Sequence, residues 1–503
     1  MEAGHGYLEE KRLDGVIHFI GVGGYGMSAL AEILVDRGYA VSGCDMRVNS
    51  RTEHLAARGL DFHVGHDASH LAGVGAVVYS TDVPADNVER LEALRRGVPL
   101  LHRSELLAWL MEQRRSIAVA GTHGKTTTSS MLGLILYQAG LEPAIAIGGE
   151  PSYLGRSGAN GEGDLMVAEA CESDGTIVRY HPWISIVTNL EPEHLNHYEG
   201  DFANLKEAVR RFIGNTQRGG AVVLNAADPV LAGLQDAVPQ GVERIGYLPP
   251  HIENEEGADG ADEVRVDSDA WSLFWSAKDL QLGELGWSFT AVRADEAVTR
   301  VTLSVPGRHN VGNALAALAA ATRAGVAAPT AAEILGSYQG AHRRFEVLGK
   351  AGGVVIVDDY AHHPTEVRAT LAAARQRAGD GRVIVLFQPQ RHSRTRDLME
   401  EFSRSFTGAD LLYLADIYAP AGDPPIPGVT SETLADRIGA QTGVQPPVLH
   451  SWSEMVDTLR RVIRPGDLVL TMGAGDIDHV AHLLLQELVA EERSEAAATH
   501  SRL

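Results

Sequence analysis

Residues 118–130, AVAGTHGKTTTSS, decide how this chain folds. They follow a short apolar run typical of a buried strand and open an amphipathic helical pattern, which indicates a strand–loop–helix unit. Glycines in the loop allow a tight turn, and the amides around them can point at phosphate oxygens at the positive end of the helix. The stretch therefore predicts a triphosphate-binding loop made of Gly121, Thr122, His123, Gly124, Lys125, Thr126 and Thr127.

Two side chains of this loop carry the expected chemistry. Lys125 can reach the β- and γ-phosphates of ATP, and the Thr126 hydroxyl can hold Mg²⁺. The spacing departs from the general G-x-x-x-x-G-K-[ST] pattern, because position 119 is valine and the glycines are only three apart. A coincidental glycine turn with a solvated lysine is the alternative. The strand–loop–helix context favours ATP and Mg²⁺ as cofactors.

Candidate magnesium ligands follow two further strand-like runs, in EACESDG (169–175) and TNLEPEHL (188–195). In a doubly wound sheet these loops lie on the same edge as the phosphate loop. Carboxylate, hydroxyl and imidazole groups can all serve the metal of a phosphoryl-transfer site. We therefore predict a magnesium site made of Thr126, Glu169 and His194. Surface residues that cap helices are the alternative for each carboxylate taken alone.

Strand and helix patterns alternate along the whole chain, which predicts parallel sheets with crossover helices. We expect three consecutive α/β domains at residues 1–114, 115–337 and 338–490. Residues 251–269 are acidic and poor in large apolar side chains, so we predict a flexible surface insertion there. The tail, 491–503, has no core pattern and is predicted to be disordered.

A second glycine loop, GVGGYG (21–26), ends the first strand-like run, and Asp45 ends the next one. Such a loop lets backbone amides approach a pyrophosphate, while the acidic residue can accept from a hydroxyl or a base. The pattern suits a dinucleotide as well as a nucleoside diphosphate. An NAD-dependent dehydrogenase is therefore an alternative, but it leaves the phosphate loop at residues 121–127 unexplained.

The third segment contains FQPQRHSRTRDL, in which Arg391 and Arg394 are three positions apart. On a helical turn they share a face, and two guanidinium groups suit a carboxylate or a phosphate. A solvated basic face is the alternative. The adjacent pair His362–His363 does not predict zinc, because neighbouring positions rarely point at one metal. No further Cys/His set has the spacing of zinc ligands.

The composition of the 503-residue chain narrows the functional classes. Its formal net charge of −23 argues against a general nucleic-acid binder. No stretch has the length and apolar character of a membrane helix, so no membrane partner is expected. The two cysteines, Cys44 and Cys171, are too few for a disulfide framework and fit a reducing compartment. We expect a cytoplasmic protein.

Taken with PGRHNVGNALAA, HRRFEVLG, VDDYAHHPTEV and PIPGVT, these motifs resemble the muramyl-ligase family, in family order, over nearly the whole chain. The resemblance implies a Rossmann-like UDP-binding domain, a P-loop ATPase-like central domain and a Rossmann-like C-terminal domain. It implies a UDP-sugar site at Gly21, Gly23, Gly24, Gly26, Met27, Asp45, Ser80 and Thr81. It extends the ATP site to His309, Asn310, Asn313 and either Arg343 or Arg344, and it places the amino acid at Tyr360, His362, Arg391 and Arg394.

The resemblance further implies an ATP-dependent acid–amino-acid ligase that joins UDP-N-acetylmuramate and L-alanine through an acyl phosphate, in peptidoglycan precursor synthesis. Lys125 and His194 are the catalytic residues it implies. A ligase that adds a peptide or another amino acid to the same UDP-sugar is an alternative. A non-catalytic nucleotide-binding paralogue is another, because the chain departs from the family pattern at Tyr25, Cys171, Asn196 and Gln390. Monomer and homodimer both remain open.

Overall fold

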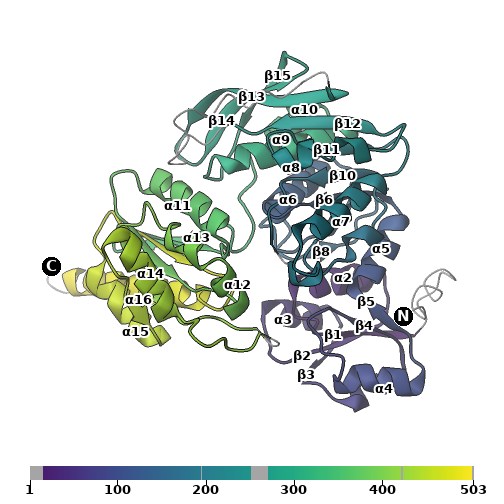
Figure 1. The fold of residues 1–503 in the computed structure, drawn as a ribbon. Coiled ribbons are helices and arrows are strands. Elements are labelled where there is room, and N and C mark those ends of the chain that lie inside the picture. The colour runs from purple at the N-terminus through teal and green to yellow at the C-terminus, as the bar shows by residue number, and fades with distance from the viewer. Residues whose placement is uncertain (1–14, 194, 251–269, 421–422, 501–503) are drawn as a thin grey trace. The chain divides into compact units, whose positions relative to one another are not determined.

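The computed structural model describes residues 15–193, 195–250, 270–420 and 423–500, without the side chains of residues 196 and 495–500. His194 and the acidic segment 251–269 lie outside the described residues. The described chain forms three separate sheets with connecting helices, so the predicted three-domain α/β fold is confirmed (Figure 1). Of the helices in the described ranges, none has the length and apolar character needed to cross a membrane.

The first sheet has five parallel strands in the order β3-β2-β1-β4-β5. The strands are β1 (Val16–Ile20), β2 (Val41–Asp45), β3 (Asp61–Val64), β4 (Val74–Tyr79) and β5 (Leu100–His102). The helices are α2 (Tyr25–Asp36), α3 (Ser50–Ala57), η1 (Ala68–Leu71), α4 (Val88–Arg96) and α5 (Arg103–Glu112). The strand order changes direction between β1 and β4, and ligands of such sheets gather at the carboxyl ends beside that point. The loop after β1 is GVGGYG.

The second sheet has ten strands in the order β15-β14-β13-β12-β11-β10-β6-β9-β7-β8. Its strands are β6 (Arg115–Ala120), β7 (Ala144–Ala146), β8 (Gly158–Ala159), β9 (Leu165–Glu169), β10 (Ile184–Val187), β11 (Ala221–Asn225), β12 (Glu243–Leu248), β13 (Leu273–Leu282), β14 (Trp287–Arg293) and β15 (Glu296–Thr302). The helices are α6 (Lys125–Gln138), η2 (Thr176–Arg179), η3 (Leu195–His197), α7 (Phe202–Gly214), α8 (Pro229–Ala232), η4 (Gln235–Ala237), α9 (His309–Arg323) and α10 (Ala328–Leu335). Strand β6 lies between β9 and β10 and is parallel to both, so their carboxyl ends meet at one edge.

The third sheet has the order β16-β17-β21-β18-β19-β20, with only β16 antiparallel to its neighbour. Its strands are β16 (Glu346–Ala351), β17 (Val354–Asp359), β18 (Val383–Phe387), β19 (Leu411–Ala415), β20 (Val448–Leu449) and β21 (Leu468–Met472). The helices are α11 (Pro364–Ala378), α12 (His392–Asp397), α13 (Met399–Ser403), α14 (Ser431–Thr442), α15 (Trp452–Val462) and α16 (Asp478–His500). Strand β18 reads VIVLF and is buried throughout, as expected for a parallel strand covered on both faces.

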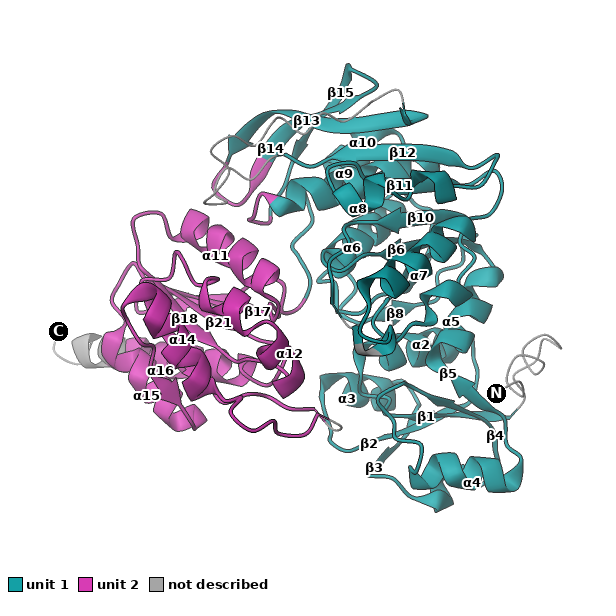
Figure 2. Ribbon diagram, viewed as in Figure 1, with its two compact units in different colours: residues 1–282, 288–304, 309–341 teal, residues 283–287, 305–308, 342–503 magenta. Residues whose placement is uncertain are grey.

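The chain divides into two compact units (Figure 2). One contains the first and second sheets and spans residues 1–282, 288–304 and 309–341; the other contains the third sheet and spans 283–287, 305–308 and 342–503. The domain boundaries at 114/115 and 337/338 stay a prediction, since the structure groups the first two sheets together.

Helix α2 joins the first two sheets. It packs against β7 and β8 of the second sheet, and one continuous apolar core extends across both. Glu32 accepts a hydrogen bond from the amide of Gly158 at 2.5 Å, and Asp36 accepts one from the amide of Asn160 at 2.9 Å. A Cβ on Gly158 would collide with the backbone of Ala29, so only glycine permits this close approach.

The end of the chain differs from the sequence-based expectation. Helix α16 continues to His500, whereas disorder was predicted from residue 491. Glu491 pairs with Arg460, and Glu492 accepts from the amide of Gly352 at 2.6 Å. The sequence EERSEAAATH is rich in strong helix formers, so the helix can extend beyond the core that starts it.

Candidate active site

The phosphate loop lies at the carboxyl end of β6 and leads into α6. Gly121 and Gly124 have φ of +123° and +80°, a left-handed backbone that favours glycine. Space is restricted as well, because a Cβ on Gly124 would lie 2.6 Å from Oδ1 of Asn313. A Cβ on Gly121 would lie even closer to a neighbour, 2.2 Å from the Thr188 hydroxyl oxygen, so the loop requires glycine at both predicted positions for conformation and for space.

The end of β10 holds the loop in place. Oδ1 of Asn189 accepts from the amide of His123 at 2.8 Å, and the Thr188 hydroxyl donates to the His123 carbonyl at 2.5 Å. The Thr122 hydroxyl accepts from the amide of Glu191 at 2.9 Å. These bonds fix the loop before any ligand arrives. A preorganised loop needs little ordering when it binds a phosphate.

The Lys125 side chain lies largely buried, 12% exposed, beneath the loop. Its ammonium group donates to the carbonyls of Gly121 and Thr122 at 2.5 and 2.9 Å and forms an ion pair with Glu172 at 3.1 Å. Burial opposes the charged form, but the nearby carboxylates of Glu172 and Glu169 outweigh it and hold the pKa of Lys125 above its usual value. The cation expected at a phosphate loop is therefore present and charged.

Two of the three predicted magnesium residues meet beside the loop. The Thr126 hydroxyl donates to Oε2 of Glu169 at 3.0 Å, and the same oxygen accepts from the amide of Gly148 at 2.9 Å. His194, the third, lies outside the described residues. Cys171, one of the departures from the family pattern, donates its thiol to Ser173 at 3.0 Å, and burial raises its pKa. A neutral thiol adds no ligand for a hard cation.

Helix α9 brings a polar pair next to the loop. The Asn313 side chain donates to Asn310 at 3.0 Å and accepts from the Thr128 hydroxyl of α6 at 3.3 Å. His309 is the first residue of the same helix. These three residues, expected at the ATP site, therefore lie on the helix that packs against the phosphate-loop helix, although they are almost 200 positions further along the chain.

The first glycine loop differs from the expectation in its hydrogen bonds. The amide of Gly21 donates to the Cys44 carbonyl at 2.8 Å, that of Gly23 to the Asp45 carboxylate at 2.9 Å and that of Gly24 to the Gly21 carbonyl at 3.3 Å. The end of β2 thus occupies two of these amides and the loop itself the third, and Asp45 braces the loop. Any pyrophosphate contact then falls to the start of α2, beginning at Tyr25.

Other predicted residues of the UDP-sugar site are Met27 in α2 and the pair Ser80 and Thr81, which follows β4. The Met27 side chain is 3% exposed within the apolar core, and its place in the UDP-sugar site stays a prediction. Thr81 lies near the loop end of β4 and bonds with His102 at 2.9 Å and Asp174 at 3.3 Å. Ser80 precedes it, half-buried.

Sequence reasoning missed two arginines that lie at this loop. A Cβ on Gly26 would lie 3.3 Å from a guanidinium nitrogen of Arg103, which pairs with Asp174 at 3.0 Å. Arg51 lies 4.0 Å from the ring centre of Tyr25 and pairs with Glu150 at 3.1 Å. Arg103 directly follows β5, and a position at a strand's carboxyl end was the one signal that could have found it.

In the third domain the structure separates Arg343 from Arg344. Arg343 is buried with φ of +58°, pairs with Asp358 at 2.8 Å and donates to the carbonyls of Gly475 and Gly473 at 2.7 and 2.6 Å. These contacts occupy its guanidinium group and give it a structural role. Arg344 is half-buried with its guanidinium 5.2 Å from the ring centre of Tyr360. Arg344 is the better candidate of the pair.

The expected amino-acid residues lie at the carboxyl ends of β17 and β18. His362 contacts the Tyr360 carbonyl through Nδ1 at 2.8 Å. Arg391 has φ of +69° and only caps α12, so the prediction that it shares a helical face with Arg394 is wrong. Arg394 is buried in the helix and donates to Gln390, another departure from the family pattern. The three-residue spacing was misleading because Arg391 has a left-handed φ and precedes the first residue of the helix.

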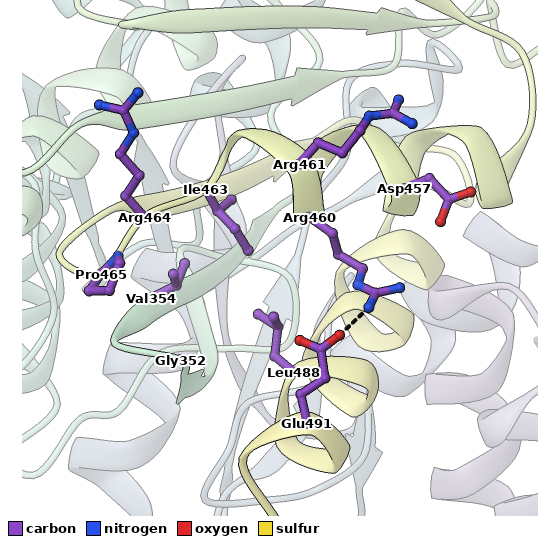
Figure 3. A pocket seen from close by; sticks show the side chains of 10 residues that line it. All are labelled: Gly352, Val354, Asp457, Arg460, Arg461, Ile463, Arg464, Pro465, Leu488 and Glu491. Carbon is purple, nitrogen blue, oxygen red and sulfur yellow. Dashed lines mark hydrogen bonds and ion pairs between the residues drawn. The ribbon is translucent and has the colours of Figure 1, made fainter. Parts of the chain in front are cut away.

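A pocket of about 630 Å³ lies elsewhere in this domain (Figure 3). It is lined by Arg460, Arg461, Arg464 and Gly352, close to where β17 and β21 begin. Arg460 is neutralised by Glu487 at 2.9 Å and by Glu491. This is the amino-terminal edge of the sheet, opposite the carboxyl ends where ligands of such sheets gather and where the amino-acid residues are expected.

Three sequence profiles match the chain: "Mur ligase family, catalytic domain" at residues 16–115, "Mur ligase middle domain" at 119–321 and "Mur ligase, glutamate ligase domain" at 343–475. The UDP-N-acetylmuramate–L-alanine ligase of Symbiobacterium thermophilum is 48% identical over 488 residues, 96% of this chain and 97% of that protein. Its counterpart from Sorangium cellulosum is 40% identical over 477 residues, 94% of this chain and 97% of that protein.

Solved structures share the fold. The UDP-N-acetylmuramate–alanine ligase of Thermotoga maritima superposes with a TM-score of 0.78 at 24% identity, covering 95% of this chain and 100% of that one. The murein peptide ligase of Psychrobacter arcticus gives 0.68 at 24% identity, covering 94% and 99%. Fold, phosphate loop and profiles together define a three-domain ATP-dependent ligase. The chain belongs to the Mur ligase family.

Proposed function

We propose that this protein joins the lactyl carboxylate of UDP-N-acetylmuramate to the amine of L-alanine at the expense of ATP, in peptidoglycan precursor synthesis. Relatives that carry the name of this ligase match almost the entire chain at up to 48% identity. The two cysteines, Cys44 and Cys171, are both unpaired, which supports a cytoplasmic location.

The observation that carries the proposal is the charged Lys125 beneath a fixed loop, paired with Glu172 at 3.1 Å. A carboxylate is a poor electrophile, so the reaction begins with its attack on the γ-phosphoryl group of ATP. This gives an acyl phosphate and ADP. Lys125 offsets charge on the transferred phosphoryl oxygens, the electrostatic role expected in such transfers. The amine of L-alanine then attacks the acyl carbon, and phosphate leaves.

The Thr126 hydroxyl and the Glu169 carboxylate, 3.0 Å apart, form an oxygen donor set that fits Mg²⁺. We propose that they hold this ion together with His194, and that it neutralises phosphate charge when bound. Cys171 remains a thiol hydrogen-bonded to Ser173, so this departure from the family pattern leaves the oxygen donors intact.

The incoming amino acid is proposed to bind at the carboxyl ends of β17 and β18. Arg391 and Arg394 are the candidate partners of its carboxylate, because guanidinium groups form paired hydrogen bonds with carboxylates. Arg344 is the proposed phosphate contact from this domain.

The test is a panel of amino acids and the L-Ala-γ-D-Glu-diaminopimelate tripeptide, each supplied with UDP-N-acetylmuramate, ATP and Mg²⁺. We expect ADP release and a product mass one alanine residue larger only with L-alanine. Faster turnover with the tripeptide than with L-alanine would show that the substrate is a peptide and would contradict the proposal of L-alanine. ADP release that needs no amine would contradict ligase activity, and no ADP with any pairing would favour a non-catalytic role. Sedimentation of the same sample decides between monomer and homodimer.

A further inference from the structure

A second cluster of chemically active side chains lies in the first domain, away from the phosphate loop. It gathers His18 from β1, Cys44 from β2, His70 from η1 and Glu89 from α4. One ligand atom from each of these four residues lies within 4.8 Å of the other three. His66, in the segment between β3 and η1, adjoins them, with Nδ1 3.2 Å from the Cys44 sulfur.

Glu89 is the centre of the cluster. Its oxygens lie 2.7 Å from Nδ1 of His70, 3.0 Å from the Cys44 sulfur and 3.4 Å from Nε2 of His18. The side chains of His18 and Glu89 are completely buried, and Cys44 is fully buried as well. Within the described ranges, every ion-pair partner of Glu89 is an imidazole.

His18 supplies an independent sign of a ligand. Its Nδ1 is bonded to the Ser42 hydroxyl at 2.8 Å, whereas its Nε2 makes no hydrogen bond among the described residues beyond the long 3.4 Å ion-pair contact with Glu89. A fully buried imidazole nitrogen without a hydrogen bond is costly. This nitrogen points at the Glu89 carboxylate. A metal ligand whose other ring nitrogen is fixed by a hydroxyl or carbonyl is the usual arrangement of a coordinating histidine.

We propose that His18, Cys44, His70 and Glu89 form a structural zinc site. Two imidazoles, one thiolate and one carboxylate give four ligands of the types zinc prefers. Their charges, with Zn²⁺, add up to zero, which suits a site that is closed to water. A network held by hydrogen bonds alone would gain little from Cys44, because a thiol is a weak donor.

The contacts of Glu89 need only a small adjustment to admit the ion. Zinc–nitrogen and zinc–oxygen bonds of about 2.0–2.1 Å place tetrahedral ligand atoms roughly 3.3 Å apart, and thiolate slightly further. The contacts of Glu89 with His70 and Cys44, at 2.7 and 3.0 Å, are shorter, and its contact with His18, at 3.4 Å, already fits. Glu89 therefore moves outward by about 0.5 Å to admit the ion.

The site braces the first glycine loop. The Cys44 carbonyl accepts from the amides of Gly21 and Val22 at 2.8 and 3.0 Å, and the neighbouring Asp45 carboxylate accepts from Gly23 at 2.9 Å. Zinc at Cys44 thus anchors the strand end to which the loop is bonded. Sequence spacing gave no sign of it, because the ligands are far apart along the chain and meet only in the folded sheet.

The test uses the full chain, purified without a histidine tag from zinc-supplemented medium and kept in excess Mg²⁺ and ATP so that the phosphate loop is occupied. Elemental analysis should find about one zinc per chain. Replacing the metal with Co²⁺ should produce thiolate-to-cobalt charge-transfer absorption. A chelator should lower the melting temperature and weaken UDP-N-acetylmuramate binding measured by calorimetry.

Cys44→Ser and His70→Asn should each weaken zinc binding by at least about tenfold and make the melting temperature insensitive to chelator. His54→Gln, which changes an exposed histidine of the same domain, should behave as the wild type. Since Cys44 is buried, His70→Asn, at a partly exposed position, tests the site even if Cys44→Ser fails to fold. Absence of bound metal in the wild type, or equal zinc content in wild type and folded variants, would overturn the proposal.

Discussion

Replacing Lys125 with alanine tests the phosphate loop most directly, because its ammonium group has both a catalytic and a structural role. The side chain of Glu172 is 1% exposed and pairs with Lys125 at 3.1 Å. Removing one partner of a buried ion pair leaves an uncompensated charge, which costs about 3–5 kcal/mol. For a domain of this size that corresponds to a fall in melting temperature of roughly 6–20 °C.

The catalytic loss should be larger than the structural one. Without Lys125 the transferred phosphoryl group loses its closest fixed cation, so kcat should fall by at least about 10³-fold. UDP-N-acetylmuramate binding, measured by calorimetry, should remain, because the first glycine loop is in another domain. ADP release at saturating substrates gives the rate, and differential scanning calorimetry gives the stability.

The double variant Lys125→Ala/Glu172→Gln separates the two effects. It should recover most of the melting temperature, since no buried charge is left unpaired, and none of the turnover. Turnover of Lys125→Ala within about tenfold of the wild type would refute the catalytic role. An unchanged melting temperature in the single variant would refute the ion-pair argument instead.

Four further substitutions have distinct expected outcomes. Gly124→Ala forces a Cβ to 2.6 Å from Asn313 at φ of +80°, so the KM for ATP should rise by an order of magnitude or more; an unchanged KM would contradict the restricted space. Arg343→Ala should lower the melting temperature through loss of a buried ion pair, whereas Arg344→Ala should lower kcat with the melting temperature preserved; the reverse pattern would exchange their roles. Burial raises the pKa of Glu32 from 4.5 to about 7, so the stability contributed by its protonated form is complete below about pH 4.5 and is lost as the pH rises to about 7. Glu32→Gln should therefore gain stability over the wild type by about 3 kcal/mol between pH 5 and 8 in urea titrations, and a pH-independent difference would refute the shift.

Local sequence was a good guide to the sheets and to the phosphate loop. Runs such as VIVLF become buried parallel strands, and Thr126 and Glu169 meet because the ends of neighbouring parallel strands share an edge. The shared helical face of Arg391 and Arg394 was wrong because Arg391 has a left-handed backbone and lies outside the helix. A motif also does not reveal burial, such as that of Met27 and Arg343. Contacts between distant segments, such as that of Gly26 with Arg103, could not be predicted from local sequence either.

The close approach of Gly158 to α2 has a practical consequence for anyone who would study the first domain in isolation. A chain cut after residue 114 would expose to water the apolar face of α2 that β7 and β8 now cover, and leave the carboxyl groups of Glu32 and Asp36 without the amides they bind. Such a fragment should aggregate, so a useful truncation retains residues 1–341 as one piece.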